Sequence, residues 1–63
     1  MTEQQIEILR LLREGHKDSE IMHELGIGVT DFNSAVKDAI VELNARTRVQ
    51  AVVIAIKKGA IKL

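Results

Sequence analysis

The sequence contains no cysteine, proline, tryptophan or tyrosine, and its only aromatic residue is Phe32. Without cysteine the chain can form neither a disulfide nor a thiolate-bound metal site, which fits a reducing compartment. No uninterrupted apolar run approaches the ~18 residues that a membrane-spanning helix needs, and the N-terminus shows no signal-peptide pattern. We therefore expect a protein of the cytoplasm without membrane contact.

The chain also lacks an excess of either charge, since nine Lys and Arg residues balance nine Asp and Glu residues. Domains that bind nucleic acid are usually visibly basic, so such a function would depend on where individual charges lie. The 63 residues leave room for one core, so we expect a single domain over residues 1–63. A core of this size rarely contributes more than ~3–5 kcal/mol net, which makes self-association a natural source of further stability.

Capping residues and glycines divide the sequence into four helical segments. Thr2 and Gln5 have the spacing of a capping box and predict the start of a first helix, which Gly15 ends. Asp18 is expected to cap a short second helix that ends at Gly26. The sequence thus predicts two helices within its first 26 residues.

Two further helices follow in the second half of the chain. The third is expected to begin at Gly28 or Thr30 and to end near Asn44. Thr47, with a glutamine three residues later, repeats the capping-box spacing and predicts a fourth helix that stops before Gly59. All regular structure is therefore expected to be α-helical.

Apolar residues recur by threes and fours along each helix and predict the core. In the fourth helix, Val49, Val52, Val53 and Ile56 share one face, which we expect to point inward. The opposite face is largely apolar too, and its small alanines would let a second helix approach closely. We therefore expect a homodimer contact there, with an unpartnered apolar surface as the alternative; the residues of this face are Ala51, Ile54, Ala55 and Lys58.

The second and third predicted helices are separated by about four residues that include glycine, which is typical of a helix-turn-helix unit. Three stretches, EILRLLREG (7–15), SEIMHELGI (19–27) and RTRVQAVVIAIKKGAI (46–61), resemble the LuxR-type (FixJ- or NarL-type) DNA-binding domain of bacterial transcription regulators. The resemblance implies an all-α, four-helix fold whose third helix enters the major groove and whose fourth helix forms the dimer. Because the domain usually ends a longer regulator, the chain is either a stand-alone regulator or an excised domain.

The same resemblance places Asn33, Ser34 and Lys37 at the positions that face base edges. These side chains suit that role, because Asn can pair with adenine, Lys can donate to guanine and Ser can serve either. Contacts with the DNA backbone are expected from a second set: Lys17, Ser19, Thr30, Arg46 and Arg48. For the two arginines the alternative is an ordinary surface charge or an ion pair with Glu42.

The third helix carries three acids, Asp31, Asp38 and Glu42, and departs from the family pattern at Asp31 and Glu42. With Ala35 these acids form one stripe, beside the stripe that carries Ser34 and Lys37. We expect the acids to turn aside from the bases, where they could reject incorrect sequences while salt screens their repulsion of phosphate. Equally, Asp31 could simply complement the helix dipole while the other two are solvated.

The leading hypothesis is a homodimeric transcription regulator that binds double-stranded DNA without a cofactor or metal. An enzyme is not expected, because no acid or nucleophile accompanies His16 or His23 and no phosphate-binding glycine loop is present. The alternative is a protein-interaction module of the same fold that pairs with a full-length LuxR-type regulator and does not read DNA. The zero net charge and the acidic stripe favour this alternative.

Overall fold

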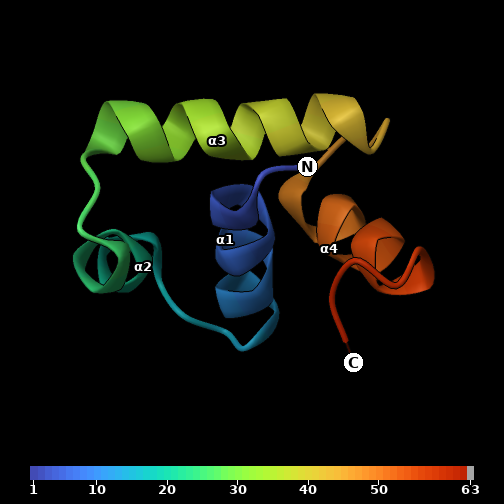
Figure 1. Ribbon diagram of the computed structural model, residues 1–63, viewed down its shortest axis with the longest axis horizontal. Coiled ribbons are helices and arrows are strands. Elements are labelled where there is room, and N and C mark those ends of the chain that lie inside the picture. The colour runs from blue at the N-terminus through green and yellow to red at the C-terminus, as the bar shows by residue number, and fades with distance from the viewer. Residues whose placement is uncertain (63) are drawn as a thin grey trace.

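The computed structural model describes residues 1–62, which form four α-helices and no strand. Helix α3 lies across one end of the molecule, and α1 runs away from its middle with α2 and α4 on either side (Figure 1). This arrangement confirms the predicted all-α architecture. The helices span α1 Glu3–Arg13, α2 Asp18–Leu25, α3 Val29–Glu42 and α4 Arg48–Lys57.

The start of α1 is fixed by the predicted capping box. The Thr2 hydroxyl accepts a hydrogen bond from the Gln5 backbone N–H at 3.1 Å, and the Gln5 side chain accepts from the Thr2 N–H at 3.0 Å. Two N–H groups that the first turn would leave unpaired are thereby satisfied. At the other end Gly15 has φ +91°, a conformation that glycine adopts without strain, and the chain turns toward α2.

Helix α2 begins one residue earlier than the sequence predicted. Lys17 occupies the N-cap position and Asp18 is the first helical residue, so the expected N-cap role of Asp18 is wrong. The Glu20 side chain accepts from the Lys17 N–H at 2.7 Å, which satisfies that donor and leaves the Asp18 carboxylate free for another contact. Residues 26–28 then connect α2 to α3, with Gly28 as the N-cap of α3.

Helix α4 begins at the cap that the sequence predicted. The Thr47 hydroxyl accepts from the Gln50 N–H at 3.1 Å. The Gln50 side chain does not complete the capping box, because it accepts from the Arg46 N–H at 2.6 Å and not from Thr47. This bond fixes the entry to α4 one residue further upstream.

The core consists of two clusters that share α1. The first cluster joins α1 to α2 and the start of α3, with Phe32 only 1% exposed; its buried members are Ile8, Leu11, Ile21, Phe32, Ala35 and Val36. The second joins α1 to the end of α3, to α4 and to the chain after α4; its buried members are Leu9, Ala39, Leu43, Ala51, Ala55 and Ile61. Both clusters pack against the same side of α3, so the opposite side of this helix is exposed.

The orientation of α4 differs from the prediction at two of the four residues expected to point inward. Val52 and Ile56 are half-buried and pack against the second cluster, as expected. Val49 and Val53, which were expected to point inward, are 75% and 45% exposed, whereas Ala51 and Ala55 are completely buried. Small side chains let the backbone of α4 approach its neighbours closely, so they occupy the packed face. The predicted dimer role of Ala51 and Ala55 is therefore wrong. On α3, Val29 is 62% exposed and also lies outside the core.

Candidate nucleic-acid interface

The outer surface of α3 presents the three residues that were predicted to face bases. Asn33, Ser34 and Lys37 are all exposed, as is Thr30 one turn earlier. Successive residues turn by ~100° around a helix, so these side chains are spread over the side opposite the buried Phe32. The structure thus brings the predicted base-reading residues together on one accessible surface.

The acidic residues of α3 lie along one edge of that surface, next to the start of α1. Asp31 and Asp38 line a polar hollow together with Ser34 and the side chains of Thr2 and Gln4. The hollow borders the start of α1, and the N-terminal end of a helix carries the positive end of its dipole.

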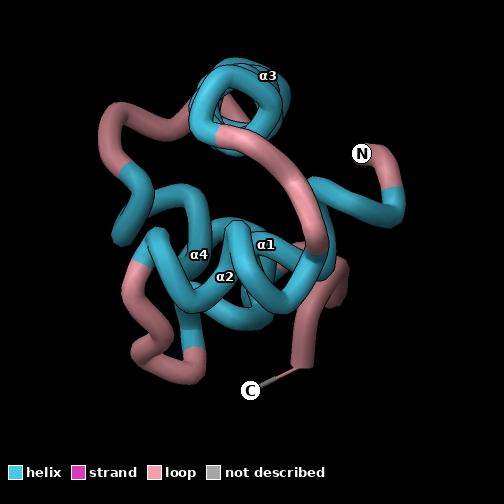
Figure 2. Tube along the Cα trace, turned by 90° about the vertical axis from the view of Figure 1, so that its left-hand side faces the viewer, coloured by secondary structure: helices cyan, strands magenta, loops and turns pink. Residues whose placement is uncertain are grey.

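Glu42 is the third acid of this edge, and it has a partner of its own. One of its carboxylate oxygens lies 2.7 Å from the amino group of Met1. Figure 2, which looks along α3, shows the N-terminus to one side of that helix. The acidic edge of α3 thus faces the N-terminal segment and not the centre of the outer surface.

The residues expected to contact phosphates differ in their exposure and in whether they form ion pairs. Lys17, Ser19 and Arg46 are exposed, and among residues 1–62 neither Lys17 nor Arg46 forms an ion pair. Arg48 is engaged, because its Nη1 lies 2.7 Å from Oδ1 of Asp18. Its guanidinium carbon also lies 5.5 Å from the centroid of the Phe32 ring. The alternative that one of the two arginines pairs with Glu42 is wrong, because Arg48 pairs with Asp18 and Glu42 pairs with the amino group of Met1.

Charge is distributed unevenly along the chain despite the zero total. All nine acidic residues fall within residues 1–43, whereas the charged residues of 44–63 are all basic. Arg46 precedes α4 and Arg48 opens it, and the first turn contains no acid. Cations at a helix N-terminus oppose the dipole at a typical cost of about 0.3–1 kcal/mol each. An anionic ligand near this end of α4 would remove that cost. The five basic residues are Arg46, Arg48, Lys57, Lys58 and Lys62.

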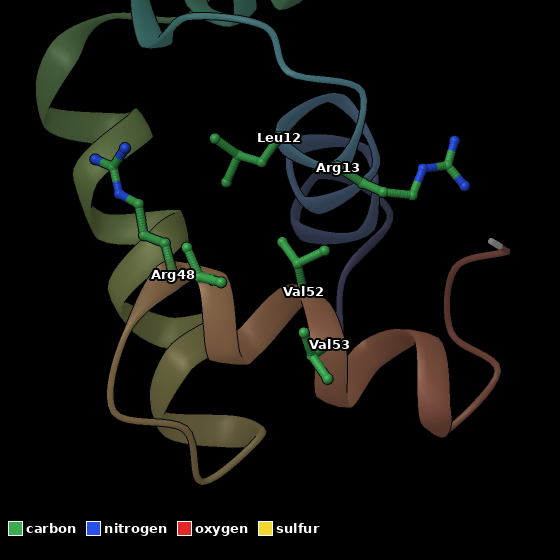
Figure 3. Close-up of a pocket in the computed structure, with 6 residues that line it drawn as sticks. Leu12, Arg13, Arg48, Val52 and Val53 are labelled. Atoms are coloured by element: carbon green, nitrogen blue, oxygen red, sulfur yellow. The ribbon is translucent and has the colours of Figure 1, made fainter.

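The exposed valines of α4 border an apolar groove between α1 and α4, with a volume of about 340 Å³. Figure 3 shows Val52 pointing from α4 toward α1, with Val53 further along α4, Leu12 on α1 and Arg48 at the edge of the group. Of the residues predicted for a dimer contact, Ile54 is half-buried and Lys58 is exposed, and neither lines the groove. The accessible apolar surface of α4 is therefore the one with Val49 and Val53.

Three features of this region had no place in the prediction. The Asp18–Arg48 pair joins residues 30 positions apart, and nothing in the local pattern links them. The Met1–Glu42 pair requires the N-terminus to lie beside the end of α3. Ile61 is 4% exposed because the chain folds back after Gly59 onto α1 and α4. Only its apolar character, within a basic C-terminal segment, could have indicated burial.

Other kinds of site find little support in residues 1–62. No helix there has the length and apolar character to cross a lipid bilayer. No three His, Asp or Glu side chains of that part of the chain are grouped so that they could hold a metal ion. Comparisons with protein-family models, curated proteins and solved structures find no match for the chain. The surface of α3 and its surroundings are therefore the candidate functional site.

Proposed function

We propose that the chain is a DNA-binding transcription regulator of the LuxR type, which inserts α3 into the major groove of double-stranded DNA. The observation that carries the proposal is the outer surface of α3, where Asn33, Ser34 and Lys37 are exposed together. A helix of 14 residues is about 21 Å long, and the groove, ~12 Å wide, admits a helix. The acids at one edge leave the middle of this surface to neutral and basic groups.

Two exposed cations outside α3 support the same proposal. Lys17 lies at the start of α2 and Arg46 just before α4, and both are exposed without an ion-pair partner in residues 1–62. Most protein–DNA hydrogen bonds go to the backbone and set the position of the reading helix. Lys17 and Arg46 would supply such contacts to the strands that border the groove.

The regulator would bind as a dimer through the exposed valines of α4. A standard interface buries ~800 Å² on each partner, which is about a fifth of the 4246 Å² accessible surface of this chain. Helix α4 has ten residues and is about 15 Å long, so its valine face alone cannot supply such an area. We therefore expect a weak dimer that forms on DNA, with half-sites about one helical turn, roughly 34 Å, apart.

The test begins by selecting bound duplexes from fragmented genomic DNA and then compares Asn33→Ala and Lys37→Ala with the unmodified chain. Asn33→Ala should lower discrimination at particular base pairs by about 1–3 kcal/mol. Lys37→Ala should weaken binding more than Lys57→Ala, a matched control that removes one exposed lysine from the end of α4. Unchanged discrimination in Asn33→Ala would remove its base-reading role, and no retention of any DNA at low salt would refute the proposal.

A second function is favoured by one observation, the 75% exposure of Val49 beside the apolar groove. A helix with this surface could pair with a full-length LuxR-type regulator without reading DNA itself. In that case the chain would capture such a regulator in a pull-down, and a Val53→Asp variant would not. Capture of a regulator, together with absence of DNA retention, would select this function over the first.

A further inference from the structure

Arg48 and Asp18 form the only ion pair between two helices among residues 1–62. Arg48 opens α4 and Asp18 opens α2, so the contact joins the starts of both helices. Figure 3 shows the Arg48 side chain extending from α4 alongside the ribbon of α3. The two side chains are 39% and 43% exposed, so solvent and ions reach the pair.

The guanidinium is also held from a second side. Its central carbon lies 5.5 Å from the centroid of Phe32, within the ~6 Å over which a cation is attracted to an aromatic face. Phe32 is fixed in the core, so the ring gives Arg48 a rigid support. The cation is therefore already in place before any ligand arrives, and what Asp18 adds is neutralisation of its charge.

Asp18 is flanked in the sequence by two exposed residues that can bind an anion, and it contacts Arg48, which can do the same. Lys17 precedes it and is exposed, Ser19 follows it and is exposed, and the Arg48 guanidinium lies against it. Lys17, Ser19 and Arg48 were each expected to contact the DNA backbone. The Asp18 carboxylate therefore contacts one of the residues that would otherwise hold a phosphate, Arg48, and the other two are its neighbours in the sequence.

We propose that the Asp18 carboxylate occupies the Arg48 guanidinium in place of a DNA phosphate and thereby limits how tightly the chain binds DNA. The inference rests on the proposed DNA-binding function. Both Asp and phosphate accept hydrogen bonds from a guanidinium, so they compete for the same donors. Because the pair is exposed, a phosphate can replace the carboxylate without the chain unfolding.

The competing explanation is that the pair only ties α2 to α4. The two explanations differ in the sign of the effect on DNA binding. If the pair is a tie, loss of the Asp18 charge loosens the start of α2 and leaves DNA binding weaker or unchanged. If Asp18 competes with phosphate, the same change releases a cation and makes binding tighter.

The experiment compares Asp18→Asn with Glu24→Gln, using the whole chain and a labelled mixed-sequence DNA duplex over a range of salt concentrations. Each substitution removes one carboxylate from α2 and keeps the side-chain shape, but Glu24 has no ion pair with Arg48. Releasing one phosphate-binding cation should steepen the salt dependence by about 0.9 in slope and tighten binding roughly threefold at low salt. Glu24→Gln should leave the slope unchanged.

A double variant, Asp18→Asn with Arg48→Gln, identifies the cation responsible. The gain should disappear in it, because no guanidinium remains for the phosphate. Equal slopes for Asp18→Asn and Glu24→Gln, when the unmodified chain binds the duplex, would overturn this inference alone. Failure of every form of the chain to bind the duplex at low salt would overturn the proposed function and this inference with it.

Discussion

Ala51 and Val53 lie two residues apart on α4, yet Ala51 is completely buried and Val53 is 45% exposed. Residues at this separation differ by ~200° around a helix, so they face nearly opposite sides. The helix packs Ala51 and Ala55 into the second core cluster and leaves Val49 and Val53 on the surface. Small side chains therefore occupy the position where the backbone of α4 comes closest to its neighbours.

This orientation predicts opposite responses to the same kind of change at two sites. Ala51→Leu adds carbon atoms where no space is left and should lower the free energy of unfolding by about 1–3 kcal/mol. Val53→Leu also enlarges the side chain, but at an exposed position, and should stay within about 0.5 kcal/mol. Urea unfolding of both variants, followed by circular dichroism, measures the difference. Equal values for the two variants would contradict the orientation of α4.

The sequence contained enough to predict the helices but not the pairing of their faces. Thr2, Thr47 and Gly26 act within one or two turns of their own position, so their local spacing predicted helix ends correctly. The two faces of α4 were both apolar, and the periodicity could not say which one meets α1. That choice depends on how closely two backbones approach in space, which no single helix encodes.

The candidate site was predictable to a similar degree. The family resemblance placed Asn33 and Lys37 on the outward side of the third helix, and both side chains are exposed in the structure. The state of Arg48 did not follow, because its partner Asp18 lies 30 residues earlier and meets it only after α2 and α4 have packed. Contacts between distant segments were therefore the part that local patterns missed.

Phe32 is predicted to be the residue on which the first core cluster depends most. It is the largest fully buried side chain and contacts residues from α1 and α2. Phe32→Ala should cost about 3–5 kcal/mol, comparable with the whole net stability of a core this small. We expect this variant to lose cooperative unfolding in calorimetry, whereas Phe32→Leu should retain a transition at lower temperature. A cooperative transition in Phe32→Ala near that of the unmodified chain would contradict the central position of the ring.

The ion pair of Glu7 and Arg10 predicts a dependence of stability on acid pH. Hydrogen bonds from Arg10, at 2.7 and 2.9 Å, hold the pKa of the Glu7 carboxyl below its ordinary 4.5. A depressed pKa in the folded state contributes stability above the unfolded value, and this is lost as the pH falls through the folded value. Glu7→Gln should therefore lower the Tm near neutral pH, and the difference from the unmodified chain should shrink as the pH falls below 4.5. A Tm difference that stays constant over this range would exclude the linkage.

The acidic edge of α3 predicts an effect on DNA binding that depends on distance and salt. Asp38 is exposed at the side of the surface that we propose enters the groove, and it has no ion pair among residues 1–62. A carboxylate about 10 Å from a phosphate repels it weakly through water, and salt near 0.1 M weakens the repulsion further. Asp38→Asn should therefore tighten binding to a mixed-sequence duplex by roughly twofold at low salt, with a smaller gain as salt rises.

Glu24→Gln provides the control for this prediction, since it removes the same charge from α2. If the repulsion is local to the groove, the gain in Asp38→Asn should exceed the gain in the control when both are titrated by fluorescence anisotropy. The salt slope should change far less in either variant than the ~0.9 expected for one released cation, because Asp38 holds no cation that a phosphate would take over. Equal affinities for the two variants would mean that the Asp38 carboxylate has no local influence on DNA binding.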